Sequence, residues 1–115
     1  MTCRRILPAM TQSMRMRAVD CEVGADDEAV EVVLSGEIDI SVADELEAWL
    51  LQVCDDKEAL TLDLAKVGFM DSTGLHMLIG LKRELESSGR QLLLSNLSEP
   101  IEELLSVSGL TTFFD

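Results

Sequence analysis

The chain of 115 residues contains few aromatic and few basic residues. One tryptophan, three phenylalanines and no tyrosine make up 3% of it, so its core must be built mainly from aliphatic side chains. Nine Lys and Arg stand against 22 Asp and Glu, which gives a formal net charge of −13. Nucleic-acid-binding surfaces need clustered basic residues, and this balance therefore argues against direct binding of DNA or RNA.

Cysteine and histidine are also scarce. Cys3, Cys21 and Cys54 show no Cys-x-x-Cys or Cys/His spacing, so we expect neither a disulfide framework nor a zinc site. The only histidine, His76, lies near no Gly-x-Ser-x-Gly elbow or metal motif and is expected to be an ordinary surface residue. These absences predict a protein that is not an enzyme, has no cofactor or metal, and works in a reducing cytoplasm.

Long apolar segments are missing as well. No stretch reaches the ~18 apolar residues of a membrane-spanning helix, so no membrane insertion is expected. Residues 1–17 hold four arginines and no acid, and they lack the continuous apolar region of a secretion signal. We predict that residues 1–17 form a flexible N-terminal extension and residues 18–115 one domain. Its acidic surface either keeps the protein dissolved or docks on a basic partner.

The residue pattern from residue 18 onward predicts alternating strands and helices. Two β-prone runs, 18–23 and 29–35, flank an acidic turn and should pair antiparallel. Further elements are expected in this order: a helix over 42–53, a strand over 59–65, a helix from Gly74, a buried strand over 91–96, a helix after Ser98 and a short edge strand over 111–115. The order β-β-α-β-α-β-α-β predicts an α/β fold with a mixed, mostly parallel sheet and helices packed on it.

Polar residues gather in the loops at the carboxyl ends of the predicted parallel strands. In open α/β sheets this edge is where ligands and partners usually bind. The loop residues are Glu37 and Asp39 in the first loop, Asp71, Ser72 and Thr73 in the second, and Asn96 and Ser98 in the third. We also predict that Ser41 and Asp44 form a capping box for the first helix, and that Ser98 caps the third.

The cluster Asp71-Ser72-Thr73-Gly74 allows two interpretations. Asp, Ser and Thr are all good helix N-caps, so the cluster can be a cap alone. A cap does not need a second hydroxyl, however, and a serine at a helix N-terminus can carry a phosphate because the helix dipole and free amides favour negative charge. A phosphate beside Asp71 would repel a docked partner, which describes a binding switch.

The segments GEIDIS, LTLDLAKVGFMDSTGL and LSNLSEPIEELLSVSGL, in this order and spacing, resemble the STAS domain of bacterial anti-sigma factor antagonists. The resemblance covers about Val19 to Asp115 and implies the STAS fold. It implies that Ser72 is phosphorylated, with Thr73 as the alternative acceptor. The partner-binding residues would be Glu37, Asp39, Asp71, Ser72, Thr73 and Gly74.

The resemblance also implies the partners. An anti-sigma factor serine kinase of the GHKL type would bind the unphosphorylated chain and release a sigma factor. Phosphorylation would end that binding, and a PP2C-type phosphatase would reverse it.

Two departures from the family pattern and two other roles stay open at this point. The family usually continues into a fourth helix, which this chain lacks, so Phe113 and Phe114 would be free to form a homodimer contact. The arginine-bearing extension lies outside the family core. The alternative roles are a non-phosphorylated STAS adaptor of a lipid-transport ABC complex and a component of a stressosome or chemotaxis-type pathway.

Overall fold

Five strands form one sheet in the order β1-β2-β3-β4-β5 in the computed structural model, which describes residues 12–16 and 19–114. The pairs β1–β2 and β2–β3 are antiparallel, whereas β3–β4 and β4–β5 are parallel. The elements are β1 (Gln12–Met16), β2 (Val19–Ala25), β3 (Ala29–Ile38), α1 (Ala43–Val53), β4 (Ala59–Met70), α2 (Ser72–Ser87), β5 (Gln91–Ser95) and α3 (Glu99–Val107).

The mixed sheet with packed helices confirms the predicted fold class, but both ends of the order differ. Strand β1 lies inside the stretch 1–17 that we expected to be a flexible extension; residues 1–11 and 17 are outside the described residues. At the other end, residues 111–114 form turns, so the predicted edge strand was wrong for them. The described order is β-β-β-α-β-α-β-α.

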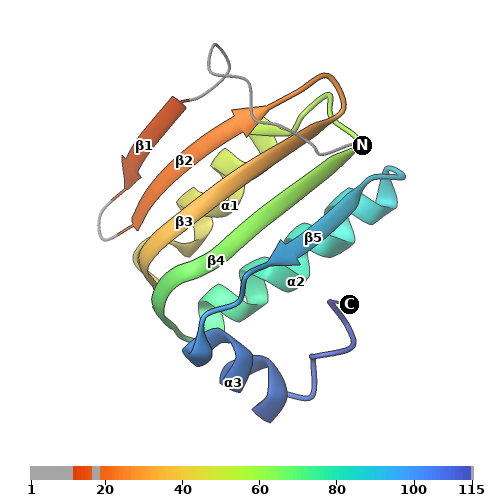
Figure 1. Cartoon of the computed structure of the whole chain (residues 1–115). Coiled ribbons are helices and arrows are strands. Elements are labelled where there is room, and N and C mark those ends of the chain that lie inside the picture. Colours follow the sequence, from red (N-terminus) through yellow and green to blue (C-terminus); the bar gives the residue numbers. More distant parts are fainter. Residues whose placement is uncertain (1–11, 17–18, 115) are drawn as a thin grey trace.

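Helices α1 and α2 lie on one face of the sheet, and α3 lies at its end beside β4 (Figure 1). Alternate residues of the strands point into this interface, and Leu34, Leu60, Leu62 and Leu64 are fully buried there. Burying a leucine side chain stabilises a fold by about 1.5–3 kcal/mol, so aliphatic packing makes up for the scarcity of aromatic residues.

Strands β3 and β4 run further than the sequence pattern indicated. Residues 36–38 were predicted as a loop but belong to β3, and β4 continues to Met70. Both strands end in a side chain that the domain buries, because Ile38 is 0% and Met70 6% exposed. Two register shifts between β3 and β4 accommodate the extension, and they place Glu37 opposite Phe69.

The predicted ends of α2 and α3 are confirmed. Gly89 and Gly109 have φ of +78° and +71°, the left-handed conformation that glycine adopts easily after a helix. The amides of Arg90 and Leu110 each donate to a carbonyl five residues back, at 2.8 Å. Both helices therefore stop in Schellman motifs.

The loop after β5 is fastened to β4. Ser98 occupies the N-cap position of α3, as predicted, but makes no capping hydrogen bond; its hydroxyl donates instead to the carbonyl of Val67 at 2.6 Å. The side-chain Nδ2 of Asn96 donates to Asp63 Oδ2 at 2.9 Å. Strand β5 is also less buried than predicted, since Leu93 is 45% exposed.

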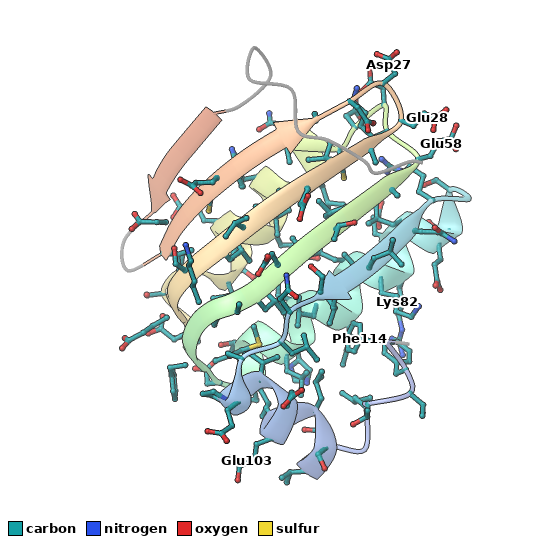
Figure 2. All side chains as sticks on the ribbon, viewed as in Figure 1. Asp27, Glu28, Glu58, Lys82, Glu103 and Phe114 are labelled. Carbon is teal, nitrogen blue, oxygen red and sulfur yellow. The ribbon has the colours of Figure 1, made fainter. Side chains whose placement is uncertain are left out.

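The aromatic pair near the C-terminus lies beside α2, where Figure 2 shows Phe114 close to Lys82 of that helix. Phe114 is 9% exposed and Phe113 is half-buried, and their rings meet edge to face at 5.0 Å. The Lys82 ammonium lies 5.4 Å from the centre of the Phe113 ring. The expectation that both rings are free for a dimer contact was therefore wrong for Phe114.

Candidate functional site

Asp71 caps the N-terminus of α2 at the end of β4. Its Oδ1 accepts hydrogen bonds from the amides of Thr73 at 3.0 Å and Gly74 at 3.2 Å, and from the Thr73 hydroxyl. The backbone is extended at Asp71, as a cap requires, and its own amide donates to the carbonyl of Ile38 at 3.2 Å. The cap thus joins the start of α2 to the ends of both β3 and β4.

These contacts favour the charged form of Asp71. The hydrogen bond from the Thr73 hydroxyl lowers the pKa of the carboxyl most, and the amides of Gly74 and Thr73 lower it further against partial desolvation. The carboxylate is therefore ionised at neutral pH and forms a fixed negative charge at the start of the helix.

Ser72 is the first residue of α2, and its side chain is exposed. Within the described part of the chain its hydroxyl makes no hydrogen bond, whereas the hydroxyl of Thr73 is donated to Asp71. Thr73 is also half-buried. Of the two adjacent hydroxyls, the one on Ser72 is the more accessible to another protein.

Gly74 allows the first turn of α2 to lie against the strands. A Cβ atom at this position would come within 2.5 Å of Met70 Cγ and 3.0 Å of Ile38 Cγ2, closer than such atoms normally approach. Gly74 itself is buried. Because Gly74 has no side chain, the first turn of α2, which carries Ser72, can pack closely against Met70 and Ile38.

Asp39 lies in the turn between β3 and α1 and makes a similar set of bonds. Its Oδ1 accepts from the amide of Ser41 at 2.9 Å and from the Ser41 hydroxyl at 2.6 Å. The predicted capping box of Ser41 and Asp44 was wrong, because α1 begins at Ala43 and its N-cap, Val42, makes no side-chain cap. Asp39 is half-buried, so it is less exposed than we expected for a loop residue.

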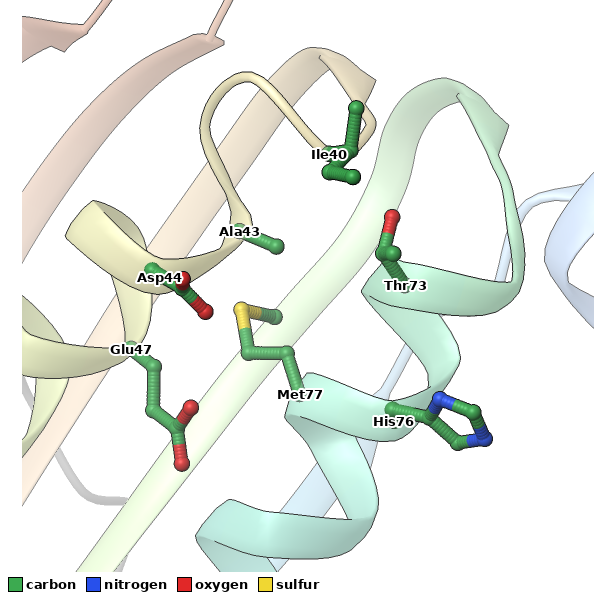
Figure 3. Close-up of a pocket in the computed structure, with 7 residues that line it drawn as sticks. All are labelled: Ile40, Ala43, Asp44, Glu47, Thr73, His76 and Met77. Carbon is green, nitrogen blue, oxygen red and sulfur yellow. The ribbon is translucent and has the colours of Figure 1, made fainter.

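A cleft of about 310 Å³ opens between the N-terminal parts of α1 and α2 (Figure 3). We call it the α1–α2 cleft; Ile40, Ala43, Asp44, Glu47, Thr73, His76 and Met77 line it. Met77 reaches from α2 toward α1, while His76 points away from α1, as expected for a surface residue (Figure 3). Ile40 is 76% exposed at the mouth, although it is a large apolar residue.

Negative charge dominates the α1 side of this cleft. Burial raises the pKa of Glu47, and repulsion from Asp44 and Glu84 raises it further. The sequence reasoning missed Ile40, Glu47 and Met77 as site residues. The sequence offered only a weak signal, an isoleucine inside the predicted loop GEIDIS, because a single exposed apolar residue is common on protein surfaces.

The six residues predicted to bind a partner come from two neighbouring strand ends. Asp39 follows β3, and Asp71, Ser72, Thr73 and Gly74 follow β4. Glu37 is the second-to-last residue of β3, and its side chain is exposed. Asn96 and Ser98 bond back to β4 instead.

The start of α2 cannot offer all of its amides to an added anion. Asp71 already accepts from the amides of Thr73 and Gly74, two of the first three in the helix. A phosphate on Ser72 would therefore project toward solvent beside an ionised carboxylate. A phosphate at this position would thus add negative charge at the surface and would not be a buried, helix-bound anion.

Residues 12–16 and 19–114 hold no group of three or more His, Cys, Asp and Glu placed to bind a metal ion. None of the helices in this part of the chain combines the length and the apolar character needed to cross a membrane. Its two cysteines, Cys21 and Cys54, are free and buried.

Known proteins resemble the chain in sequence. A profile of the STAS domain matches residues 21–115. The anti-sigma-B factor antagonist of Bacillus subtilis (strain 168) is 31% identical over 97 residues, which are 84% of this chain and 89% of that protein.

Solved structures share the fold. The anti-sigma factor antagonist SpoIIAA in its unphosphorylated form matches with a TM-score of 0.68 at 23% identity, over 89% of this chain and 83% of that one. The Bacillus cell fate determinant SpoIIAA in its phosphorylated form matches with a TM-score of 0.63 at 23% identity, over 89% and 86%. The chain belongs to the STAS domain family.

Proposed function

We propose that the chain works as an anti-sigma factor antagonist whose binding is switched off by phosphorylation of Ser72. The antagonist role is supported by the Bacillus subtilis relative, which is similar over most of both chains and bears that name. In its unphosphorylated form the chain binds an anti-sigma serine kinase and thereby releases a sigma factor. The phosphorylated form leaves the kinase, which then captures the sigma factor again.

The accessibility of the Ser72 hydroxyl is the observation that carries the choice of acceptor. Ser72 is exposed and unbonded among the described residues, whereas the Thr73 hydroxyl is held by Asp71. In the proposed reaction Ser72 Oγ attacks the γ-phosphorus of ATP on a GHKL-type kinase, ADP leaves, and the hydroxyl proton is lost. A PP2C-type phosphatase hydrolyses the phosphoserine with water. The chain is the substrate of both enzymes, in the bacterial cytoplasm.

The docking surface we propose contains all six predicted residues, but they do different things. Glu37 and Ser72 are exposed and meet the kinase directly. Asp39 and Asp71 present their partly exposed carboxylates to basic groups of the kinase, while each keeps its turn closed. Thr73 and Gly74 hold this surface in place, Thr73 by its bond to Asp71 and Gly74 by its close packing on the strands. The α1–α2 cleft is part of the same proposed surface.

Charge explains how one phosphate ends the interaction. A phosphoserine adds about −1.5 to −2 charges, next to the Asp71 carboxylate on a strongly acidic chain. Like charges brought together in an interface cost several kcal/mol. A penalty of about 3 kcal/mol would weaken binding by roughly two powers of ten, which is enough to exchange partners.

Intact-mass spectrometry tests this proposal. The protein is incubated with ATP and a purified GHKL-type anti-sigma kinase from the same genome, and the modified peptide is then sequenced. We expect one phosphate at Ser72, none on Ser72→Ala, and a phosphate that still maps to Ser72 in Thr73→Val. A stable complex with no phosphate transfer would favour a constitutive STAS adaptor instead.

Binding of the same kinase gives the second readout. Ser72→Ala should bind as tightly as the unphosphorylated wild type and keep its affinity in the presence of ATP, whereas Ser72→Asp should bind weakly. Equal affinities for the three proteins would remove the electrostatic mechanism. Asp39→Ala should weaken binding without unfolding the domain.

A further inference from the structure

A second hollow adjoins the same end of β4, on the side of α3. It measures about 330 Å³ and is lined by Phe69, Met70, Pro100, Glu103, Leu104 and Val107. We call it the α3 groove. Phe69 and Val107 are 47% and 81% exposed, so two large apolar side chains of this groove face solvent.

The α3 groove is linked to the proposed phosphorylation site through Met70. Met70 lines the groove, immediately precedes Asp71, and lies directly against Gly74 beneath the first turn of α2. Phe69 lies only three residues before Ser72. The groove therefore includes a residue that packs under the α2 cap, and it shares no lining residue with the α1–α2 cleft.

Exposed apolar side chains concentrate around this site. Four large hydrophobic residues of the described part are exposed, namely Ile40, Phe69, Leu93 and Val107. Ile40 borders the α1–α2 cleft, and Phe69 and Val107 border the α3 groove, so three of the four flank the start of α2. Isolated exposed leucines need no explanation, but apolar residues grouped around a hollow mark an interaction surface.

The surroundings of the groove are acidic. Helix α3 has the sequence EPIEELLSV, with three glutamates and no basic residue. Glu103 lines the groove and is labelled on α3 in Figure 2, and Glu37 lies opposite Phe69 in the β3–β4 register. A second copy of this chain, with a net charge of −13, would bring like charges together there. A partner with an apolar side chain among lysines or arginines fits both the groove and its charge.

We propose that the α3 groove receives an apolar side chain from a basic segment of the anti-sigma kinase, as a second contact beside Ser72. This inference rests on the proposed function and adds where and by what chemistry the kinase is held. An apolar anchor in a hollow commonly supplies much of the affinity of an interface, and its acidic rim steers a basic partner toward it. In this proposal the apolar anchor adds affinity for the kinase, and the phosphate on Ser72 decides whether the kinase binds.

Four substitutions measured against the same purified kinase test the groove. Phe69→Thr removes the anchor wall and keeps a strand-forming residue, and we expect about tenfold weaker binding. Leu93→Thr is the matched control, because Leu93 is 45% exposed on β5 and outside the groove; its affinity should equal that of wild type. Val107→Lys should weaken binding more than Val107→Glu, since only lysine repels a basic partner.

The outcomes separate this inference from the proposed function. Urea midpoints close to wild type establish that each variant is folded. If Ser72→Asp loses binding but Phe69→Thr binds like Leu93→Thr, the groove inference is overturned and the switch stands. If Ser72→Asp binds normally, the switch itself fails. If sedimentation shows a dimer that Val107→Lys dissociates while kinase affinity stays unchanged, the groove is a contact between copies of this chain and the inference is wrong.

Discussion

Helices α1 and α2 each come after a strand that is followed directly by Asp-x-Ser or Asp-x-Thr, yet they start differently. In both places Oδ1 of the aspartate accepts from the amide and the hydroxyl of the residue two positions ahead. That residue is Ser41 for Asp39 and Thr73 for Asp71. The local hydrogen bonds are thus nearly the same.

The residue three positions after the aspartate makes the difference. After Asp71 it is Gly74, whose amide also donates to the carboxylate, and α2 begins at once with Ser72. After Asp39 it is Val42, which buries its side chain, has a non-helical φ of −127° and leaves α1 without a side-chain cap. The same motif therefore forms a helix cap at Asp71, where Gly74 lets the backbone approach the sheet. At Asp39 it forms only a turn, because the side chain of Val42 occupies that space.

The middle residue of each motif is exposed and decides what the turn can do. Ile40, in the α1 turn, exposes an apolar side chain. Ser72, in the α2 cap, exposes the hydroxyl that we propose as the phosphate acceptor. In both turns an aspartate holds the backbone and the middle residue faces solvent. The two turns therefore differ mainly in the chemistry of that middle residue.

The largest effect is expected from placing the α1 residue into the α2 motif. In Gly74→Val the new side chain would overlap Met70 and Ile38, since a Cβ alone comes within 2.5 Å and 3.0 Å of them. We expect the free energy of unfolding to fall by about 3 kcal/mol, measured by urea denaturation. Gly68→Val is the control, because nothing lies within 4 Å of a Cβ there. A stability loss no larger than that of the control would mean that the close approach of α2 is unimportant.

A smaller difference is expected when each aspartate is removed. Asp71→Ala leaves two helix amides without their acceptor and should cost about 1–2 kcal/mol in urea denaturation. Asp39→Ala frees one amide outside a helix, and the cost should be about 0.5 kcal/mol or less. Equal losses would show that the Asp39 turn stabilises the fold as much as a true cap does.

The smallest expected effect is the pH dependence of the α2 cap. The pKa of Asp71 is lowered in the folded state, so its contribution to stability is complete above the ordinary value of 3.8 and is lost as the pH falls through the folded pKa. Wild type should therefore exceed Asp71→Asn in unfolding free energy at pH 6, and this excess should shrink below pH 3.8. Urea titrations at several pH values measure it. A difference that stays constant down to pH 2 would contradict the role of the ionised carboxylate.

Much of the fold could be predicted from short-range patterns. Alternating Leu60, Leu62 and Leu64 marked a strand, and the Ser-Gly pairs before Arg90 and Leu110 marked the ends of α2 and α3. The cap at Asp71 was one of two interpretations, and the structure shows that it forms. Whether the exposed Ser72 is also phosphorylated stays a proposal that the structure supports through accessibility.

Features that depend on distant partners could not be predicted. The hydroxyl of Ser98 was expected to cap α3 but donates to Val67, which lies 31 residues earlier. Ser41 was expected to pair with Asp44 but bonds to Asp39. The reason is that the buried Val42 takes the N-cap position and α1 begins at Ala43. In each case a serine had several possible acceptors, and the packing of other elements chose among them.

The sequence by itself determined the order and kind of most elements, the acidic character of the surface and the STAS motifs, because these follow from periodicity, composition and local spacing. Only the tertiary structure decided which hydroxyl of the Ser72-Thr73 pair is free, and that exposed apolar residues border the α1–α2 cleft and the α3 groove. These features arise where β3, β4 and three helices meet, and burial there depends on residues far apart in the chain.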